Sequence, residues 1–489
     1  MLTQKDTPYF DAMIKYVRDR VVPFHTPGHK QGGGTVKKFR DLIGEKALKL
    51  DLDIDDIEDY DNALRSAQKL TAEAYGADNS FFLVNGSTGG IHTMLLATCN
   101  YGDEIIVPRN AHKSVMSGII MAGAVPVFIP YQIDKELHVP FNVEPEDVEK
   151  TIKKHPKAKV LIIASPTYYG LSTDTQKIVR IAHSYGKTML IDEAWGAHFK
   201  FHPDLPVSAM DAGADMCTNS THKLLSGLTQ SSMLHIKGNR VKKDRVKSMI
   251  TLIQTTSPSC LLRASLDCTR MQMATEGKSL LTKAIRLAEK ARNHINKIQG
   301  LCCYGKELLG KKGCYAMDPT RLIITAKELG YTGYDMEKIL RKKYKIKVEM
   351  ADLFNIVAIV SIGDTEKRID YFLSSLADFA SKEKGNVQKI QQISKKYRNI
   401  IGSLNNVPQQ LLIPHQALFS PQKALTLSNS IGGISAELIV SYPPGIPLLL
   451  PGEKISEEVI DYIKIGMEAG MKFTGAEDNS LKTIKVVSD

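Results

Sequence analysis

The sequence predicts an α/β protein built on a mainly parallel, doubly wound sheet. Between about Ser80 and Ile236, apolar runs of strand length alternate with segments of helix length. This alternation is typical of parallel strands joined by crossover helices. The chain has 489 residues, which is too long for one compact core, so at least one further domain is expected.

The alternating region contains six expected strands. They are the apolar runs at 81–84, 104–107, 125–129, 160–163, 188–191 and 232–236. Three of the helices expected between them span 111–122, 144–154 and 174–185. In such a sheet, ligands bind at the carboxyl ends of the strands, where loops lead into the helices. Motifs in those loops therefore carry the most information about function.

The flanking segments predict four parts of the chain. Residues 1–35 form an amino-terminal arm, with a short amphipathic segment at 9–17, and residues 36–270 form the large domain. A long helical stretch at 262–298 leads into a smaller α/β domain at 271–385, with strands expected at 321–325, 346–350 and 356–361. After the polar segment 382–386, residues 386–489 form a carboxy-terminal α+β domain.

Composition excludes several classes of protein. The net charge is +11, but the lysine runs are pairs without interleaved aromatic residues, so a nucleic-acid partner is not expected. The seven cysteines form no CxxC pair, which argues against a metal site and for a reducing compartment. No apolar stretch approaches the ~20 residues needed to cross a bilayer. The first residues lack a signal-peptide pattern, so a cytoplasmic location without membrane contact is expected.

Asn85–Gly90 (Asn-Gly-Ser-Thr-Gly-Gly) is a candidate phosphate site. It follows an expected strand and opens a helix, where free N–H groups, the helix dipole and the hydroxyls of Ser87 and Thr88 favour an anion. Its spacing matches neither a Walker loop nor GxGxxG. Alone, it is also compatible with an ordinary capped turn.

Asp192 and Lys223 are the candidates for holding an aldehyde cofactor. Asp192 ends an expected strand, where its carboxylate can pair with a protonated ring nitrogen or simply cap the next helix. Lys223 follows another short strand and is flanked by Ser220 and His222. A lysine beside an anion-binding crevice is suited to bond covalently to an aldehyde, although most lysines are only solvated.

His112 begins the helix after the expected strand at 104–107. Its imidazole can stack on a flat ring, or it can be structural. A phosphate site, a stacking ring, a carboxylate and a lysine at one edge of a sheet together indicate pyridoxal 5'-phosphate as the cofactor.

Seven blocks of the chain, including those around His112, Asp192 and Lys223, have the order found in a known family. They are Thr26–Lys30, His112–Ser114, Asp192–Ala194, Ser220–Lys223 and Thr255–Pro258, followed by Tyr442–Pro447 and Pro451–Glu453 near the carboxyl end. This order resembles the bacterial Orn/Lys/Arg decarboxylases of the aspartate-aminotransferase fold (fold type I), over nearly the whole chain. It is most similar to their short, wing-less Gram-positive branch, often assigned as arginine decarboxylase.

The resemblance implies residue roles and a reaction. Lys223 binds pyridoxal phosphate covalently, His112 stacks on its ring, Asp192 pairs with the ring nitrogen, and Trp195 reaches its phenolic oxygen. The phosphate is held by Ser87, Thr88, Ser220 and His222. The reaction implied is decarboxylation of a basic amino acid, with arginine to agmatine and carbon dioxide first, as in polyamine biosynthesis. The Thr255–Ser257 turn reaches the phosphate of a neighbouring subunit, which implies at least a homodimer.

Two departures from the family pattern concern the substrate. The chain has Ser257-Pro258-Ser259-Cys260, with Arg263 shortly after, where the branch usually has Ser-Pro-Ser-Tyr, and the acidic segment 56–62 is altered. Lysine and ornithine therefore stay open as substrates, and the acidic segment 55–61 is either their partner or a solvated loop. The alternatives are a related aminotransferase or aldol-type lyase, and a non-catalytic paralogue that only binds the cofactor. The proton donor to Cα, Lys223 or His222, also stays open.

Overall fold

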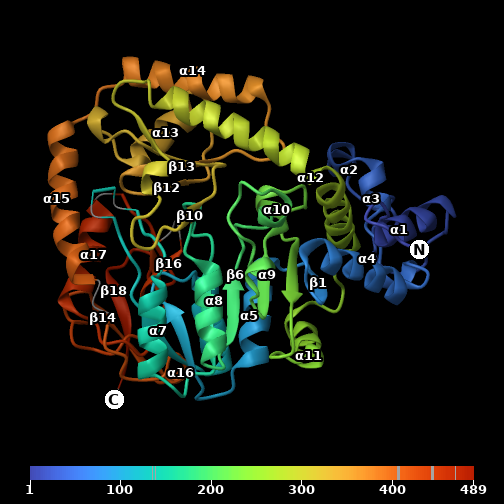
Figure 1. Ribbon diagram of the computed structural model, residues 1–489, viewed down its shortest axis with the longest axis horizontal. Coiled ribbons are helices and arrows are strands. Elements are labelled where there is room, and N and C mark those ends of the chain that lie inside the picture. The colour runs from blue at the N-terminus through green and yellow to red at the C-terminus, as the bar shows by residue number, and fades with distance from the viewer. Residues whose placement is uncertain (135, 138, 405–407, 442–444, 469, 489) are drawn as a thin grey trace. The chain divides into compact units, whose positions relative to one another are not determined.

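A computed structural model describes residues 1–134, 136–137, 139–404, 408–441, 445–468 and 470–488. The chain forms two compact units that each combine distant segments of the sequence (Figure 1). The first unit comprises Met1–Ala97 and Ile191–Leu281, and the second comprises Thr98–Leu190 and Thr282–Asp489. No helix in the described ranges is both long and apolar enough to span a bilayer.

The first unit has three strands hydrogen-bonded in the order β1-β8-β7, namely β1 (Asn79–Leu83), β8 (Ser232–Ile236) and β7 (Met216–Asn219). The last residues of β6 (Thr188–Asp192) lead to Glu193, whose N–H donates to Thr218 of β7 at 3.1 Å. Strand β8 runs antiparallel to both neighbours. Only 12 positions, 220–231, connect β7 to β8, which is at the lower limit for the crossover that a parallel pair needs. The run at 232–236 is therefore a strand as predicted, but not a parallel one.

The helices of the first unit precede and follow these strands along the chain. They are α1 (Pro8–Arg18), α2 (Lys37–Ile43), α3 (Glu45–Lys49), α4 (Tyr60–Tyr75), α5 (Gly86–Thr98), α9 (Ala209–Ala212), α10 (Thr221–Leu224), α11 (Lys243–Ile253) and most of α12 (Cys260–Ile295). The apolar face of α1, with Tyr9 and Met13 fully buried, packs in a core with α4 and the start of α12.

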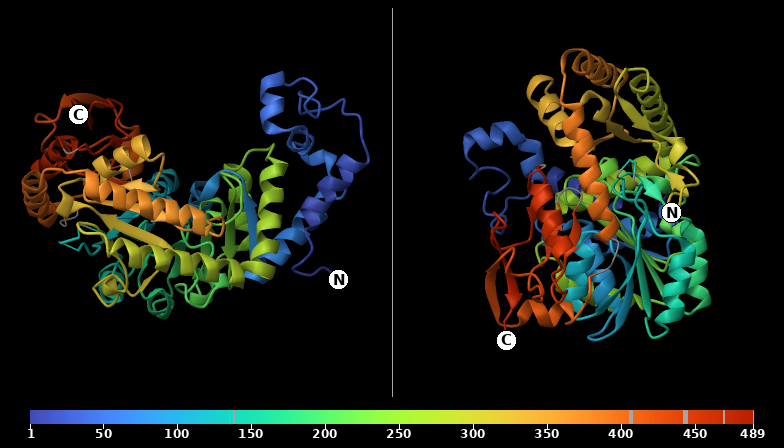
Figure 2. Two further views of the ribbon diagram at one scale, coloured as in Figure 1. Left: turned by 90° about the horizontal axis from the view of Figure 1, so that it is seen from above. Right: turned by 90° about the vertical axis from the view of Figure 1, so that its left-hand side faces the viewer.

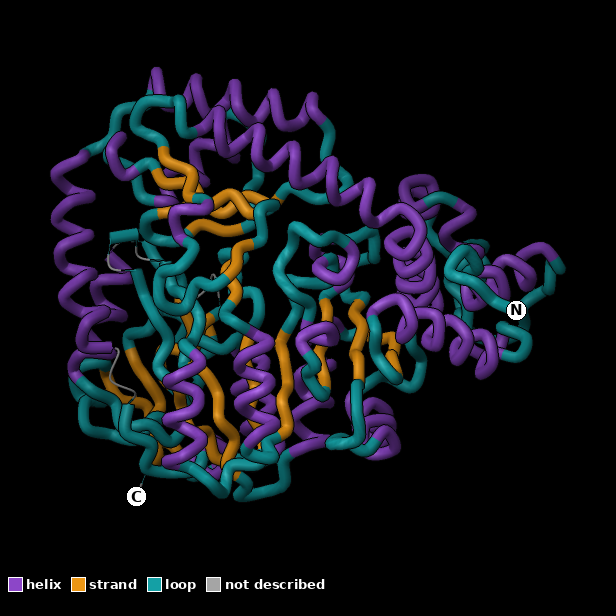
Figure 3. The backbone as a smooth tube through the Cα atoms, viewed as in Figure 1, coloured by secondary structure: helices purple, strands orange, loops and turns teal. Residues whose placement is uncertain are grey.

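The second unit contains the parallel strands predicted from the alternating pattern. Strand β2 (Glu104–Pro108) pairs in parallel with β3 (Val125–Ile129) and with β4 (Val160–Ala164). Figure 3 draws the strands of the protein in orange. Between successive strands run α6 (Lys113–Ala122) and α7 (Pro145–Lys154), and α8 (Thr175–Ser184) follows β4 and β5 (Leu171–Ser172). These bounds lie within two residues of the expected helices.

The same unit holds a smaller antiparallel sheet of order β12-β13-β11-β9. Its strands are β9 (Cys302–Tyr304), β11 (Arg321–Thr325), β12 (Met350–Ala351) and β13 (Asn355–Ile359), with β10 (Ala316–Met317) paired to β5. Helices α13 (Gly333–Lys343) and α14 (Glu366–Lys382) cover it. Ion pairs Arg286–Glu366 and Lys290–Asp370, both 2.6 Å, join α14 to the end of α12 (Figure 1).

The strand expected at 346–350 is mostly absent. Only Met350 belongs to a strand, because the chain leaves α13 through Lys345 at φ 57°, and the Ile346 N–H donates to Leu340 of the helix. A left-handed residue followed by a bond back to the helix is a helix ending, not extended backbone.

Among its described residues, the carboxy-terminal part has two small sheets and three helices. The sheets are β14 (Gln422–Thr426) with β18 (Thr483–Val487), and β16 (Ile446–Leu449), β15 (Ile439–Ser441) and β17 (Phe473–Thr474). Helix α15 (Val387–Leu404) lies beside α17 (Glu457–Glu468), and α16 (Pro414–Phe419) packs on α6 (Figures 1 and 2). An apolar core of Ile439, Leu449, Ile460 and their neighbours holds the sheets to α17.

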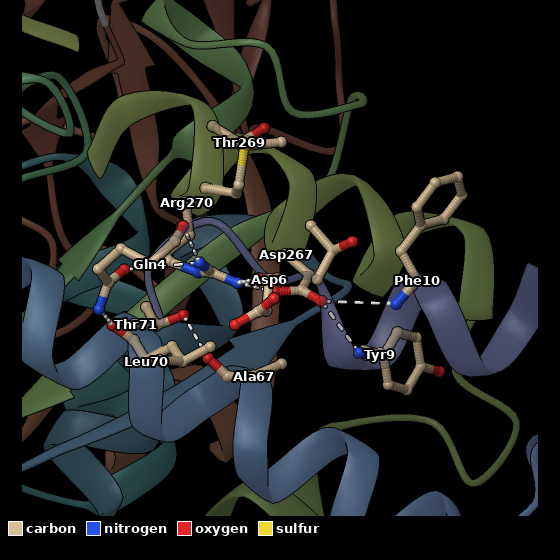
Figure 4. A network of polar contacts seen from close by, with 12 residues as sticks. Gln4, Asp6, Tyr9, Phe10, Ala67, Leu70, Thr71, Asp267, Thr269 and Arg270 are labelled. Carbon is tan, nitrogen blue, oxygen red and sulfur yellow. Dashed lines mark hydrogen bonds and ion pairs between the residues drawn. The ribbon is translucent and has the colours of Figure 1, made fainter. Parts of the chain in front are cut away.

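A buried ion pair fastens the amino-terminal arm to α12 (Figure 4). Arg270 donates to Asp267 at 2.5 Å, and both side chains are fully buried. Asp267 also accepts the N–H groups of Tyr9 at 3.0 Å and Phe10 at 3.4 Å, so it caps α1 from another segment, since Thr7 makes no side-chain cap. Arg270 donates in addition to the carbonyl groups of Gln4 and Asp6.

We expect the substitution Asp267→Ala to destabilise the first unit by about 3–5 kcal/mol, because it leaves the Arg270 charge buried without a partner and uncaps α1. Urea unfolding followed by the fluorescence of Trp195, the only tryptophan, reports on this unit directly. As a control, Glu45→Ala removes the exposed Glu45–Lys49 pair and is expected to cost under about 1 kcal/mol. Equal unfolding curves for Asp267→Ala and the control would contradict the expected effect.

Candidate active site

A cluster of hydroxyl groups forms where β1 and β7 end. Both strands are antiparallel to β8, so their carboxyl ends lie at the same edge, above the first residue of β8, Ser232. There Ser220 donates to Ser87 at 2.8 Å, and the hydroxyls of Ser87 and Ser232 are 3.0 Å apart. The strand register thus brings together two predicted phosphate ligands, Ser87 and Ser220, which are 133 residues apart.

Two glycines, Gly86 and Gly90, let the backbone of α5 lie close to the hydroxyl cluster. Gly86 begins α5 at φ 70°, a conformation that glycine adopts most readily. A Cβ added to Gly90 would lie 2.3 Å from the Thr218 hydroxyl, so only glycine fits there. The start of α5, with its positive dipole end, therefore lies directly against the hydroxyl cluster.

Lys223 lies in the same unit, in the short helix α10. Its Nζ is 4.0 Å from the centre of the Trp195 ring. Asp192, at the end of β6, is buried, and burial raises the pKa of its carboxyl. The charge of Lys223 and the Ala194 N–H, 3.1 Å away, act in the opposite direction. A lysine amine, a carboxylate and an indole ring therefore occupy one polar site with the hydroxyl cluster nearby.

A second buried carboxyl group, that of Glu193, is hydrogen-bonded to neighbouring segments of this site. It accepts hydrogen bonds from Asn219 Nδ2 at 2.8 Å and from the Ala209 N–H at 2.6 Å. Asn219 is the last residue of β7 and precedes the Ser220–Lys223 segment. Glu193 thus links the segment of Asp192 to that of Lys223. Burial raises the pKa of the Glu193 carboxyl to about 8.

His222 is half-buried and faces the loop before β8. Its Nδ1 donates to the carbonyl group of Ser231 at 2.8 Å. Burial, with a smaller contribution from Lys223, lowers the pKa of His222, although the bond to Ser231 opposes this. In the neutral ring Nδ1 carries the proton, which leaves Nε2 as an acceptor.

Two buried hydroxyl groups in this region are without a hydrogen bond among the described residues. Within the described residues, neither Thr221 Oγ1 nor Ser231 Oγ makes a hydrogen bond. Buried hydroxyls are usually satisfied, so this pair suits a bound oxyanion. Together with Ser87, Ser220, Asp192 and Lys223, they fit a phosphorylated aldehyde cofactor.

His112 lies in the second unit, as the N-cap of α6. Its Nδ1 lies 2.7 Å from the Ser114 hydroxyl and accepts the Ser114 N–H at 3.3 Å, so the ring is locked to the first turn of the helix. Three residues earlier, Arg109 forms a buried ion pair with Glu453, with Nη2 and Oε2 2.9 Å apart. One residue later, the Lys113 N–H donates to the carbonyl group of Gly445 at 3.0 Å.

Other sequence predictions have less structural support. Thr88 is exposed, and so are Thr255, Thr256 and Ser257, the turn predicted to reach a neighbouring subunit. Of the motif 442–447, residues 442–444 lie outside the described residues.

Both departures from the family pattern lie in the first unit, and Cys260 and Arg263 are buried there. Cys260 belongs to the α1 core and Arg263 is 6% exposed, with its guanidinium 5.7 Å from the centre of the Tyr60 ring. In the acidic segment, Asp56 pairs with His25 at 2.9 Å and is therefore not simply solvated.

Sequence reasoning assigned no role to Glu193, Arg109 or Glu453, although all three stand inside motifs that it singled out. The sequence signal that could have identified them is a charged residue within an apolar run beside a candidate site. Such a residue is expected to be buried and therefore to need a partner. The partners themselves are not visible in the sequence, because Arg109 and Glu453 are 344 residues apart.

Comparisons with known proteins identify the family of the chain. Residues 7–368 match the family model described as Orn/Lys/Arg decarboxylase, major domain, and residues 405–481 match the carboxy-terminal domain of the same family. An arginine decarboxylase of Bacillus subtilis is 42% identical over 492 residues, covering 100% of this chain and 99% of the relative. One of Halalkalibacterium halodurans is 43% identical over 493 residues, with the same coverage of both chains.

Among solved structures, a lysine decarboxylase of Francisella novicida superposes with a TM-score of 0.86 at 23% identity, over 99% of this chain and 81% of that one. This likeness confirms the predicted fold, the α/β fold type I of pyridoxal-phosphate enzymes. Two family models that together span most of the chain, and relatives more than 40% identical over its full length, show that the chain belongs to the Orn/Lys/Arg decarboxylase family.

Proposed function

We propose that the protein is a pyridoxal-phosphate-dependent decarboxylase of a basic amino acid, and that its substrate is L-arginine, which it converts to agmatine and carbon dioxide. The observation that carries the proposal is the position of Lys223, with its amine against the Trp195 ring, within the field of the Asp192 carboxylate and beside the hydroxyl cluster. Arginine is chosen because the relatives that match the full chain at 42–43% identity are named arginine decarboxylases.

In this proposal, each residue of the first unit has one task toward the cofactor. Lys223 bonds to the aldehyde, Asp192 holds a proton on the ring nitrogen, and Trp195 covers the region of the phenolic oxygen. Ser87, Thr88, Ser220 and His222 hold the phosphate, joined by the unpartnered hydroxyls of Thr221 and Ser231. His112 stacks on the ring.

Pyridoxal phosphate supplies the electron sink that takes up the electrons of the Cα–carboxylate bond when carbon dioxide leaves. Asp192 makes this sink stronger by keeping the ring nitrogen protonated, which its buried position near a cation allows. Lys223 must be neutral to attack the aldehyde, and its Nζ lies 4.0 Å from the centre of the Trp195 ring. Burial lowers the pKa of His222, and the one proton of its neutral ring, on Nδ1, is donated to the carbonyl group of Ser231, so Lys223 is the proposed donor of the proton to Cα.

We also propose a homodimer, in which the exposed Thr255–Ser257 turn reaches the phosphate site of the partner subunit. Large apolar side chains exposed on the arm and α2 support an interface there; they include Val22, Phe24, Val36, Phe39 and Leu42. The four domains proposed are 1–35, 36–270, 271–385 and 386–489. A cytoplasmic location is proposed because all seven cysteines, which lie in the described ranges, are free thiols.

The substitution Lys223→Ala is expected to abolish turnover and the visible absorbance of the lysine-bound cofactor, because no other amine takes its place at the aldehyde. The absorbance is measured after loading with pyridoxal phosphate and gel filtration. Lys237→Ala serves as the control, since Lys237 lies in the same unit and donates only to the carbonyl group of Met210 at 2.8 Å. Retained turnover in Lys223→Ala would contradict the assignment of this lysine.

Carbon dioxide release is expected to be strongest with arginine, with kcat/KM at least ~10-fold above that for lysine or ornithine, the lower end of the discrimination that even one methylene provides. The holoenzyme is assayed with the three amino acids in parallel, without any keto acid. A preference for lysine or ornithine would move the proposal to that substrate. A requirement for a keto acid would indicate an aminotransferase, and cofactor absorbance without release from any of the three would indicate another substrate or a non-catalytic paralogue.

Glu193→Gln is expected to flatten the dependence of stability on pH. Because the pKa of Glu193 is raised from its ordinary value of 4.5 to about 8, the folded protein holds this proton more tightly than the unfolded chain does. Its contribution to stability is complete below pH 4.5 and is lost as the pH rises through about 8. Wild type should therefore lose stability between pH 5 and 8 relative to Glu193→Gln, in urea unfolding followed by Trp195 fluorescence. The exposed Glu276→Gln is the control, and parallel curves for wild type and Glu193→Gln would contradict the role of burial.

A further inference from the structure

The motif Pro451-Gly452-Glu453 places the carboxylate of Glu453 in the interior of the second unit. Gly452 has φ 85°, and a Cβ there would lie 2.2 Å from the carbonyl oxygen of Leu412, so no other residue fits. Its N–H donates to Ser435 at 2.7 Å, and its carbonyl group accepts the N–H of Leu411 at 2.8 Å. The backbone before Glu453 is thereby fixed on both sides.

Glu453 is fully buried, and its charge is balanced by Arg109. Oε2 of Glu453 accepts Arg109 Nη2 at 2.9 Å and the Leu450 N–H at 2.8 Å. Arg109 also donates to the carbonyl group of Leu448 at 3.0 Å, and its guanidinium lies 5.0 Å from the centre of the Phe128 ring. Burial raises the pKa of Glu453 to about 7, and Arg109 limits that rise. In the described residues Arg109 Nη1 and Glu453 Oε1 have no other partner, so each charge depends on the other.

Residues on both sides of His112 in the sequence contact the carboxy-terminal part of the chain. Arg109 precedes it by three residues, and the next residue, Lys113, donates its N–H to Gly445 at 3.0 Å. At the far end of α6, His415 of α16 is hydrogen-bonded to the carbonyl group of Ile120 at 2.9 Å. The helix that His112 caps is therefore held at its start and its end by carboxy-terminal residues.

We propose that Glu453, acting through Arg109, is a positioning residue that fixes the orientation of the His112 ring at the start of α6. This rests on the proposed function, in which His112 stacks on the pyridine ring. Removal of the Glu453 charge leaves the Arg109 guanidinium buried without a counter-charge, and the guanidinium can regain solvation only by moving the 109–112 segment. The carboxy-terminal segment thus contributes to the reaction without supplying a group that touches substrate.

The first test compares wild type with Glu453→Gln, which keeps the shape and an acceptor for the Leu450 N–H but removes the charge. We expect the visible circular dichroism of the bound cofactor to fall by at least half. A displaced ring of this kind is also expected to speed cofactor release and to lower kcat by ~10-fold each, with KM changed by less than ~3-fold. Far-ultraviolet circular dichroism verifies that the variant is folded.

Asp103→Asn is the matched control, because it removes one carboxylate from the same unit. Asp103 pairs with the exposed Lys159 at 2.8 Å, just before β2 begins, and has no contact with the 109–113 segment among those described. Its visible circular dichroism and cofactor release rate should equal those of wild type.

A double-mutant cycle with His112→Ala separates positioning from general destabilisation. If Glu453 acts through His112, the double variant releases cofactor no faster than His112→Ala alone. Fully additive effects, or a Glu453→Gln variant equal to wild type in dichroism and release rate, would overturn the inference. Should Glu453→Gln not fold, Arg109→Lys, which retains the buried positive charge but not the planar donor group, enters the same cycle under the same criterion.

The outcomes also distinguish this inference from the proposed function. If wild type shows cofactor absorbance that Lys223→Ala lacks, the proposed function stands, and the cycle alone decides on Glu453. If wild type acquires no such absorbance, the proposed function fails and the inference fails with it.

Discussion

The candidate site depends on one antiparallel strand. Because β8 runs against both β1 and β7, the ends of those two strands meet above its first residue, and the hydroxyls of Ser87, Ser220 and Ser232 converge there. Helix α5 starts at this edge, and so does α10, which carries Lys223. A slip of one residue in either pairing would turn these side chains to the other face of the sheet. The register of β8 is therefore a condition for the contacts among the hydroxyls of Ser87, Ser220 and Ser232.

Buried charged groups link distant segments in both units. Asp267 and Arg270 join α12 to the arm, Glu193 joins the end of β6 to the end of β7, and Glu453 joins the carboxy-terminal part to Arg109. Two segments joined by an apolar contact of equal area could shift along each other at little cost. A buried carboxylate prevents such a shift, because it needs its donors at hydrogen-bond distance. Such pairs contribute little net stability compared with apolar replacements, but a missing partner is costly. They are thus better suited to fixing the geometry of a site than to stabilising the fold.

Local patterns in the sequence were sufficient for six strands and three of the helices between about residues 80 and 236, since each of these elements has a clear apolar pattern, whereas helices such as α4 and α11 were not predicted. They also identified Ser87, Asp192, Ser220 and Lys223 as residues at strand ends, and the structure brings Ser87 and Ser220 into contact. The direction of β8 could not be predicted, because an apolar run looks the same in a parallel and an antiparallel strand. The prediction of a strand at 346–350 was wrong. The left-handed backbone of Lys345, which ends the preceding helix, cannot be recognised from the pattern of apolar residues. The partners of Glu193 and Glu453 were missed because both are defined by tertiary contacts.

The attachment of α1 to Asp267 has a consequence for synthesis of the chain. Tyr9 and Asp267 are 258 residues apart, so at ~5–20 residues per second a ribosome needs ~13–50 s to produce the cap after α1 has been made. An isolated helix of 11 residues is marginal in water, and the side chains of Tyr9 and Met13 stay exposed during that interval. The first unit can close only when its last segment has left the ribosome, and until then the arm offers an apolar surface on which a chaperone can act.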